Sequence, residues 1–195
     1  NFCPTKINVK NLKKENIKNI FLTGNTIVDS IKIILKNQNF KFKKKSYLKN
    51  FLNSRIKVFL TVHRRENFGK PLINIFRAIK EISKIKDIKI LYPVHPNPNV
   101  KKHVSILKND KNIKLIKPLN YFDTLNILKK TDIILSDSGG IQEEAATLGK
   151  RILILRDKTE RPEILEYNGI LVGSNKNVII KKFKKFIKQK LKKTN

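Results

Sequence analysis

Residues 137–145 constrain this chain more than any other part of its sequence. They follow an apolar run, residues 133–135, that is typical of a buried strand, and they pass through Gly139 and Gly140 into residues that favour a helix. A strand, a glycine-rich turn and a helix in this order form an anion site. The first N–H groups of a helix have no partner within it, and the helix dipole is positive at that end.

Two polar side chains in this stretch suit a nucleotide. Ser138 can donate its hydroxyl to a phosphate, and Glu144, about one turn further, is a carboxylate that can accept two hydrogen bonds from a ribose diol. The alternative is an ordinary helix start, with Ser138 as the cap and the glycines forming a tight turn. The stretch alone supports both interpretations equally.

Short apolar runs alternate with helix-like patterns along most of the chain. The expected strands are residues 20–23, 56–61, 88–92, 113–116, 133–135, 151–155 and 170–172. The expected helices are residues 26–35, 71–82, 99–108, 121–130, 141–148, 162–167 and 176–193. Such alternation on short loops predicts an α/β fold, a Rossmann-like parallel sheet with helices on both faces. Residues 1–19 are polar and rich in lysine, and residues 36–54 are expected to be an exposed connector.

Ligands of such sheets bind beyond the carboxyl ends of the strands, and the polar clusters of this chain fall there. The clusters are residues 63–66, His95, residues 138–144 and residues 156–161. Arginines in these loops can meet phosphate with a planar, bidentate donor. Four such loops at one edge predict a site for a phosphorylated ligand. His95, which lies between prolines, is equally well explained as a rigid loop residue, and His103 is expected on the surface of a helix.

Composition limits the partners and the compartment. The formal net charge is +29, but lysine supplies most of it in a chain rich in Ile and Asn, which indicates a compositional drift more than a nucleic-acid-binding stripe. No apolar run is long enough to span a membrane, and the single Cys3 fits a reducing cytoplasm. The three histidines are too far apart to predict a metal site. The chain starts at Asn1 and contains no Met, so we expect it to be a piece of a longer protein.

Taken together, five segments resemble the carboxyl-terminal half of non-hydrolysing UDP-N-acetylglucosamine 2-epimerases. These segments are residues 23–29, 63–69, 92–98, 137–145 and 155–163, and the likeness covers about residues 1–175. The resemblance implies the GT-B architecture, in which two Rossmann-like domains enclose the active site. Residues 1–24 would be the entry segment, and residues 25–195 the UDP-binding C-terminal domain. The N-terminal domain would be absent.

The resemblance implies interconversion of UDP-N-acetylglucosamine and UDP-N-acetylmannosamine for cell-envelope polysaccharides. It further implies a cytoplasmic homodimer without a redox cofactor, which agrees with the lack of a dinucleotide fingerprint. UDP is eliminated after loss of the C2 proton and then added back. His63 would lie beside the diphosphate and stabilise the leaving UDP or donate a proton to it. The residues implied to bind UDP are Ser138, Gly139, Gly140, Glu144 and Arg161. Arg64 and His95 match positions where some bacterial members bind a second, allosteric UDP-N-acetylglucosamine.

The chain also departs from the family pattern. The carboxylates implied to work at C2 belong to the absent amino-terminal domain, so we expect nucleotide binding but little epimerisation from this chain alone. Leu119 and Thr124 stand where some members present Gln and Phe to the uracil, so no base contact is carried over. The alternatives are another GT-B enzyme acting on a UDP-sugar (a hydrolysing epimerase or a glycosyltransferase), a non-catalytic UDP-binding remnant, and a basic nucleic-acid-binding protein.

Overall fold

The computed structural model describes residues 1–36, 48–166 and 168–192, with side chains described up to residue 189. The chain divides into two compact units, residues 1–41 and 42–195. The predicted boundary after residue 24 stays a prediction.

The first unit pairs two short parallel strands, β1 (Phe2–Cys3) and β2 (Phe21–Leu22), and adds the helices α1 (Lys6–Lys14) and α2 (Thr26–Lys36). Helix α1 was not predicted from its polar sequence. It begins where the Thr5 hydroxyl accepts a hydrogen bond from the Asn8 amide at 3.3 Å, which caps the helix. Strand β2 is shorter than the predicted strand at residues 20–23.

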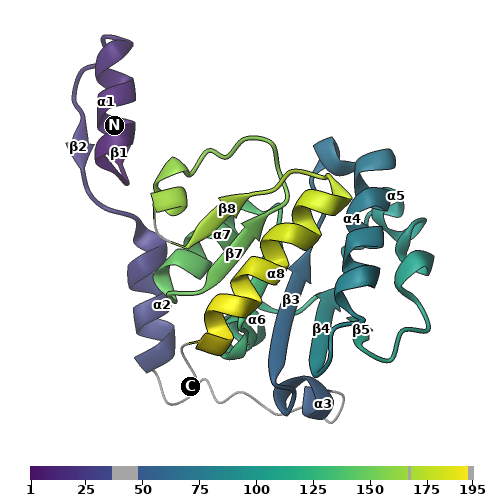
Figure 1. Ribbon diagram of the computed structural model, residues 1–195. Coiled ribbons are helices and arrows are strands. Elements are labelled where there is room, and N and C mark those ends of the chain that lie inside the picture. The colour runs from purple at the N-terminus through teal and green to yellow at the C-terminus, as the bar shows by residue number, and fades with distance from the viewer. Residues whose placement is uncertain (37–47, 167, 193–195) are drawn as a thin grey trace. The chain divides into compact units, whose positions relative to one another are not determined.

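The second unit is built on a parallel sheet, and every strand predicted for this unit is present. In the order β5-β4-β3-β6-β7-β8, six strands lie side by side (Figure 1). Their bounds are β3 Ile56–Thr61, β4 Ile88–Pro93, β5 Ile113–Ile116, β6 Ile133–Ser136, β7 Arg151–Ile154 and β8 Gly169–Leu171. Numbered along the chain, this is the doubly wound order 3-2-1-4-5-6, which reverses direction between β3 and β6.

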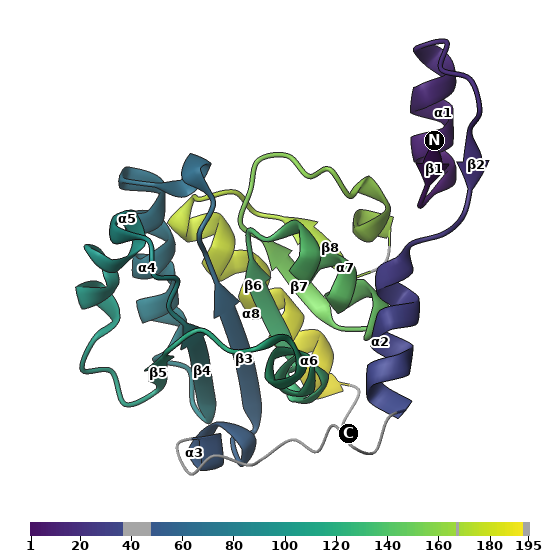
Figure 2. The ribbon, with the colours of Figure 1, turned by 180° about the vertical axis from the view of Figure 1, so that it is seen from behind.

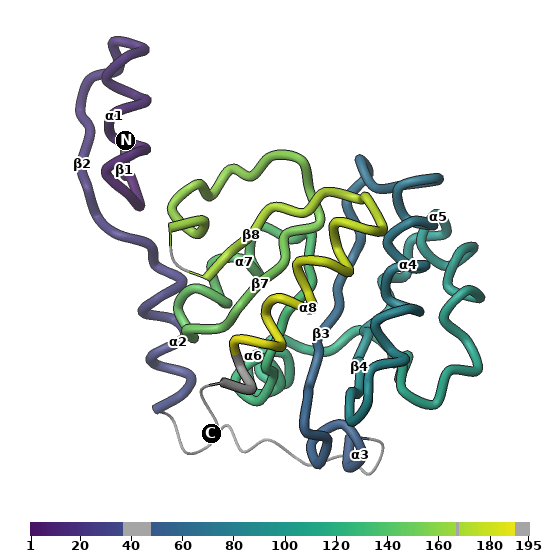
Figure 3. Tube along the Cα trace, in the orientation of Figure 1, coloured from purple at the N-terminus to yellow at the C-terminus, as the bar shows by residue number. Residues whose placement is uncertain are grey.

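Helices cover both faces of this sheet, as predicted. The α-helices are α3 Lys49–Leu52, α4 Lys70–Ile82, α5 Pro98–Lys101, α6 Tyr121–Lys130, α7 Gly139–Thr147 and α8 Lys176–Lys192. The 3-10 turns are η2 Arg65–Asn67, η3 Val104–Leu107 and η4 Pro162–Glu166. Helices α4 and α8 pack on one face, and α6 and α7 on the other (Figures 1 and 2). Figure 3 follows the chain through these crossovers.

The sheet has a hydrophobic core on each face because side chains alternate along its strands. In β3, Val58 and Leu60 face the α4 and α8 side, whereas Phe59 faces the α6 and α7 side, and all three are buried. Phe183 of α8 and Ala145 of α7 complete the two layers. Burial on both faces explains why these strands are nearly continuous apolar runs.

Three expectations need correction. The connector at residues 36–54 is not exposed throughout, since Leu48 and Phe51 lie in the core on either side of the start of α3; residues 37–47 of it lie outside the described residues. The helix expected at residues 99–108 is broken, because the amide of His103 bonds three residues back and leaves the α-helical ladder. The helix expected at residues 162–167 is the 3-10 turn η4, and Tyr167 lies outside the described residues.

In a doubly wound sheet the ligand crevice opens where the strand order reverses, beyond the carboxyl ends of the strands. Here that point lies between the loops after β3 and β6, which contain residues 62–69 and 137–138. In the described ranges, no helix combines the length and the apolar character needed to cross a membrane.

Candidate functional site

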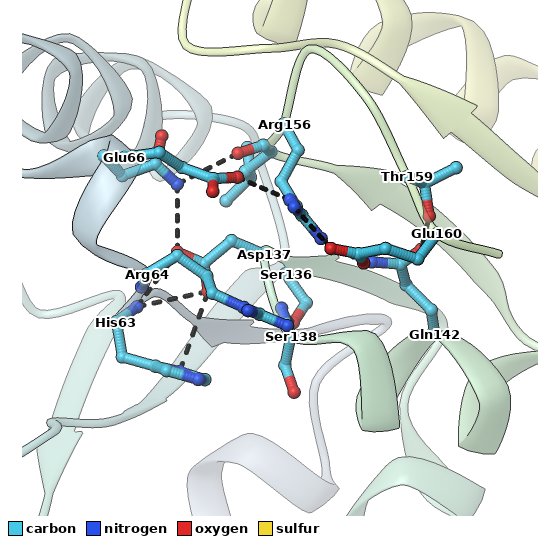
Figure 4. Close-up of polar contacts among 12 residues, drawn as sticks. His63, Arg64, Glu66, Ser136, Asp137, Ser138, Gln142, Arg156, Thr159 and Glu160 are labelled. Atoms are coloured by element: carbon cyan, nitrogen blue, oxygen red, sulfur yellow. Dashed lines mark hydrogen bonds and ion pairs between the residues drawn. The ribbon is translucent and has the colours of Figure 1, made fainter.

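The carboxylate of Asp137 joins the two loops at this crevice. It is fully buried and follows β6 directly. Its oxygens accept hydrogen bonds from the backbone amides of His63 at 3.0 and 3.1 Å and of Arg64 at 2.8 Å (Figure 4). The side-chain amide of Asn67 donates a further bond to it at 2.9 Å. With this many donors the buried charge is compensated, so Asp137 fixes the loop after β3 against the loop after β6.

Asn67 extends this connection to a third loop. Its side-chain amide also donates to the carbonyl of Leu155, just beyond β7, at 3.0 Å. Asn67 is itself buried, with 4% of its surface exposed, so both bonds are shielded from water. These bonds therefore hold the loops after β3, β6 and β7 in one arrangement.

Ser138 and the side chain of Arg64 lie together at the start of α7 (Figure 4). Ser138 is the N-cap, and its hydroxyl accepts a long bond of 3.5 Å from the amide of Ile141, which leaves the first amides of the helix, at Gly139 and Gly140, without a partner in the helix. The side chain of Arg64 extends toward Ser138 (Figure 4). Its guanidinium lies 3.6 Å from the position that a Cβ on Gly139 would occupy. A helix start and an arginine thus lie side by side, which is an arrangement suited to phosphate.

The ring of His63 lies near Asp137 and stacks on the ring of His95. The ring centroids are 5.2 Å apart with planes 20° apart, and the Nδ1 atom of His63 faces Asp137, 3.7 Å from its Oδ1. Burial lowers the pKa of His63 below its usual value, and His95 and Arg64 lower it further, whereas Asp137 acts in the opposite direction. Burial and these two neighbours therefore disfavour the protonated form of His63.

Further along α7, two buried polar groups are incompletely satisfied. Glu144 is 6% exposed, and its Oε2 atom finds no hydrogen-bond partner among the described residues. Burial, followed by the charge of Glu143, raises the pKa of Glu144 to about 7. Gln142 is fully buried; its oxygen accepts a 2.6 Å bond from the Thr159 hydroxyl, but its Nε2 atom finds no partner in the described part of the chain. Such groups are costly unless a ligand or water satisfies them.

The loop after β7 contains two arginines with different surroundings. The guanidinium of Arg156 bonds to both Glu66 and Glu160, and its side chain is only 9% exposed, so it braces the loops. Arg161 bonds to Glu143 through one nitrogen, and its side chain remains 36% exposed. Arg161 therefore keeps donors that can reach a ligand at α7.

The structure brings the predicted loops to one edge of the sheet, as the alternation of strands and helices required. Arg64 lies at the start of α7, His63 stacks on His95 next to it, and Arg161 bonds to Glu143 of the same helix. The sequence did not predict that Asp137 and Asn67 join the loops, although both lie in the segments that carried the resemblance.

His103 is partly buried, with its Nε2 sheltered and unpartnered among the described residues, which corrects the expectation of a surface position. Among the described residues, no three His, Cys, Asp or Glu form a group that could hold a metal ion.

Comparison with known proteins gives a consistent family. A family model described as UDP-N-acetylglucosamine 2-epimerase matches residues 1–195. A protein of that name from Campylobacter jejuni is 44% identical over 198 residues, which cover 95% of this chain and 52% of the relative.

Two solved structures share the fold. UDP-GlcNAc 2-epimerase from Neisseria meningitidis, bound to UDP-GlcNAc, has a TM-score of 0.88 and 39% identity over 96% of this chain and 53% of its own. The Methanocaldococcus jannaschii enzyme, in complex with UDP-GlcNAc and UDP, has a TM-score of 0.78 and 40% identity over 95% of this chain and 53% of its own. The chain spans about half the length of the curated relatives that it matches.

Proposed function

We propose, since this chain belongs to the UDP-N-acetylglucosamine 2-epimerase family, that it is the UDP-binding half of such an enzyme. The observation that carries the proposal is the junction at Asp137. The hydrogen bonds of Asp137 and Asn67 hold three loops together at the start of α7. They also fix the positions of His63 and Arg64 there. The solved relatives bound to UDP-GlcNAc have the same fold, which supports a nucleotide at this edge.

Each predicted residue has a role that its surroundings support. The amides of Gly139 and Gly140 and the hydroxyl of Ser138 bind phosphate, because they are the free donors at a positive helix end. Glu144 accepts hydrogen bonds from the ribose diol, which satisfies its unpartnered oxygen. Arg161 adds a further contact to the nucleotide, with Glu143 holding one side of its guanidinium.

His63 acts on the diphosphate. The bond between the sugar C1 and the diphosphate oxygen breaks after the C2 proton has been removed, and negative charge then develops on the UDP. A diphosphate beside His63 raises its pKa, because the anion favours the charged imidazolium. His63 can then stabilise the leaving UDP or donate a proton to it. UDP adds back once C2 has been protonated on the other face, and carboxylates of an amino-terminal domain exchange these protons.

The remaining properties follow from the family. We propose that the whole enzyme is a cytoplasmic homodimer that requires no cofactor and supplies UDP-N-acetylmannosamine for cell-envelope polysaccharides. A second, allosteric UDP-N-acetylglucosamine would contact Arg64 and His95. Both of these side chains lie against His63 or the start of α7, so such a molecule would bind next to the catalytic group.

Titration calorimetry of UDP into the chain tests the proposal. We expect binding by the wild type, and an affinity lower by about 10-fold or more for Ser138→Ala and Arg161→Ala, because each variant removes a hydrogen bond to a charged phosphate. The matched controls are Ser105→Ala and Arg77→Ala, which remove the same groups from exposed positions in η3 and α4. Equal affinities for the wild type and both site variants would contradict the assignment.

A further inference from the structure

Thr159, in the loop after β7, joins helix α7 to a residue that we assign to the nucleotide. Its hydroxyl donates a 2.6 Å hydrogen bond to the Oε1 atom of Gln142 in α7 (Figure 4). The same oxygen accepts a 3.1 Å bond from the backbone amide of Arg161. A hydroxyl has one hydrogen and two lone pairs, so it can make both bonds at once. Thr159 thus connects a side chain of α7 to the backbone of Arg161.

Helix α7 holds Arg161 at two points. The bond from the Arg161 amide to the Thr159 hydroxyl closes a turn between residues two apart, and this turn fixes the backbone from which the arginine side chain starts. The guanidinium is held separately, because its Nε atom bonds to Glu143 of α7 and its Nη1 atom donates to the carbonyl of Glu160 at 3.2 Å. Gln142 and Glu143 are consecutive residues, so one short stretch of α7 supports both ends of the arginine.

Gln142 is the buried end of this connection. Its side chain is fully buried, and its Nε2 atom has no hydrogen-bond partner among the described residues. An amide in such a place costs free energy that an apolar side chain of the same size would not. The gain that offsets this cost is the bond to Thr159, which burial also protects from competing water.

Holding Arg161 in advance favours binding. A free arginine on a loop has many rotamers, and fixing it on a ligand costs conformational entropy. We propose that Thr159, supported by Gln142, is a positioning residue that holds Arg161 where the nucleotide meets it. This inference rests on the proposed function, because it takes the contact between Arg161 and the nucleotide from it. The Thr159 hydroxyl then affects the affinity for UDP only while the Arg161 guanidinium is present.

A double-mutant cycle tests this dependence. The wild type, Thr159→Val, Arg161→Ala and the double variant are titrated with UDP in a calorimeter. Thr159→Val keeps the shape of the side chain and removes the hydroxyl, so we expect it to bind UDP about 3- to 10-fold more weakly. In the Arg161→Ala background the same change is expected to alter the affinity by less than about 2-fold. A merely structural threonine would lower the affinity equally in both backgrounds.

Three further variants sharpen the cycle, and urea denaturation verifies that each protein folds. Thr159→Ser restores the hydroxyl and is expected to bind UDP like the wild type. Gln142→Met removes the partner of that hydroxyl and keeps the length of the buried side chain, so it should weaken UDP binding, again only when Arg161 is present. It replaces Thr159→Val in the cycle if that variant does not fold. Thr147→Val is the matched control, because the hydroxyl of this half-buried threonine in α7 bonds to a carbonyl one helical turn back, at 2.8 Å, and UDP affinity should not change.

The other outcomes separate the two proposals. If Thr159→Val binds UDP as the wild type does, or weakens binding equally with and without Arg161, while Ser138→Ala still binds UDP more weakly, the positioning role is wrong and the proposed function stands. If Thr147→Val loses as much affinity as Thr159→Val, the effect is a general disturbance of α7 and the positioning role is again wrong. A wild-type chain that does not bind UDP overturns the proposed function itself.

Discussion

Two buried carboxylates, one just before α7 and one within it, have opposite surroundings. Asp137, before the helix, accepts bonds from His63, Arg64 and Asn67, which lie in another loop. Glu144, within the helix, keeps one oxygen atom without a partner among the described residues, and its pKa rises to about 7. We propose that the satisfied carboxylate holds the loops together, whereas the unsatisfied one, kept at a cost in stability, is available to a ligand.

Replacing Asp137 with Asn is the most damaging test of this comparison. The amide keeps one acceptor but turns its own N–H groups toward donors from His63, Arg64 or Asn67, so a buried donor is left unpaired. We expect Asp137→Asn to lower the free energy of unfolding by about 2–4 kcal/mol, measured by urea denaturation, and to abolish UDP binding. Asp157→Asn, at an exposed position in the loop after β7, is the control and is expected to change neither quantity. A stable Asp137→Asn that binds UDP normally would show that the three loops do not depend on this carboxylate.

The role of Asp137 also shows what the sequence could and could not predict. Strands such as β3 and β6 were predicted because each is a local apolar run, and their parallel order explains why the loops meet at one edge. The partners of Asp137 lie 70 to 74 residues away, and no local pattern records which backbone amides a carboxylate will meet.

Prediction failed elsewhere for more local reasons. Helix α1 depends on a single capping threonine in a polar segment. The break after α5 depends on one amide that bonds three residues back instead of four. In each case a polar group could form its hydrogen bond with more than one partner, and only the folded structure shows which partner it takes.

Replacing Glu144 with Gln is expected to have an intermediate effect of opposite sign on stability. The pKa of Glu144 in the folded chain lies above the ordinary value of 4.5, so the folded state favours the protonated form. The stability that goes with protonation is fully present below the ordinary pKa and is lost as the pH rises through about 7. Glu144→Gln cannot ionise, so we expect it to be more stable than the wild type at pH 8, by up to about 3 kcal/mol, and equally stable at pH 4.

Urea denaturation at the two pH values measures the stability of Glu144→Gln, and calorimetry measures its affinity for UDP. Glu144→Gln is expected to bind UDP about 10-fold more weakly, since an amide offers the ribose diol one acceptor oxygen in place of two. Glu166→Gln, an exposed acid in η4, is the control and should alter neither property. If Glu144→Gln is no more stable than the wild type at pH 8, then Glu144 is not a strained group and the contrast with Asp137 fails.

The smallest expected effect concerns His63, whose backbone amide bonds to Asp137 and whose ring stacks on His95. His95→Ala removes a stacked ring that helps to bury His63, and it also removes a neighbour whose charge disfavours protonation. Both changes act in the same direction, so the pKa of His63 is expected to rise in this variant, as followed by NMR titration of the ring protons with His103 as the internal reference. The fold should be unaffected, because the backbone amides of His63 and Arg64 still donate their hydrogen bonds to Asp137. An unchanged or lower pKa would mean that the stacked ring of His95 has no part in lowering the pKa of His63.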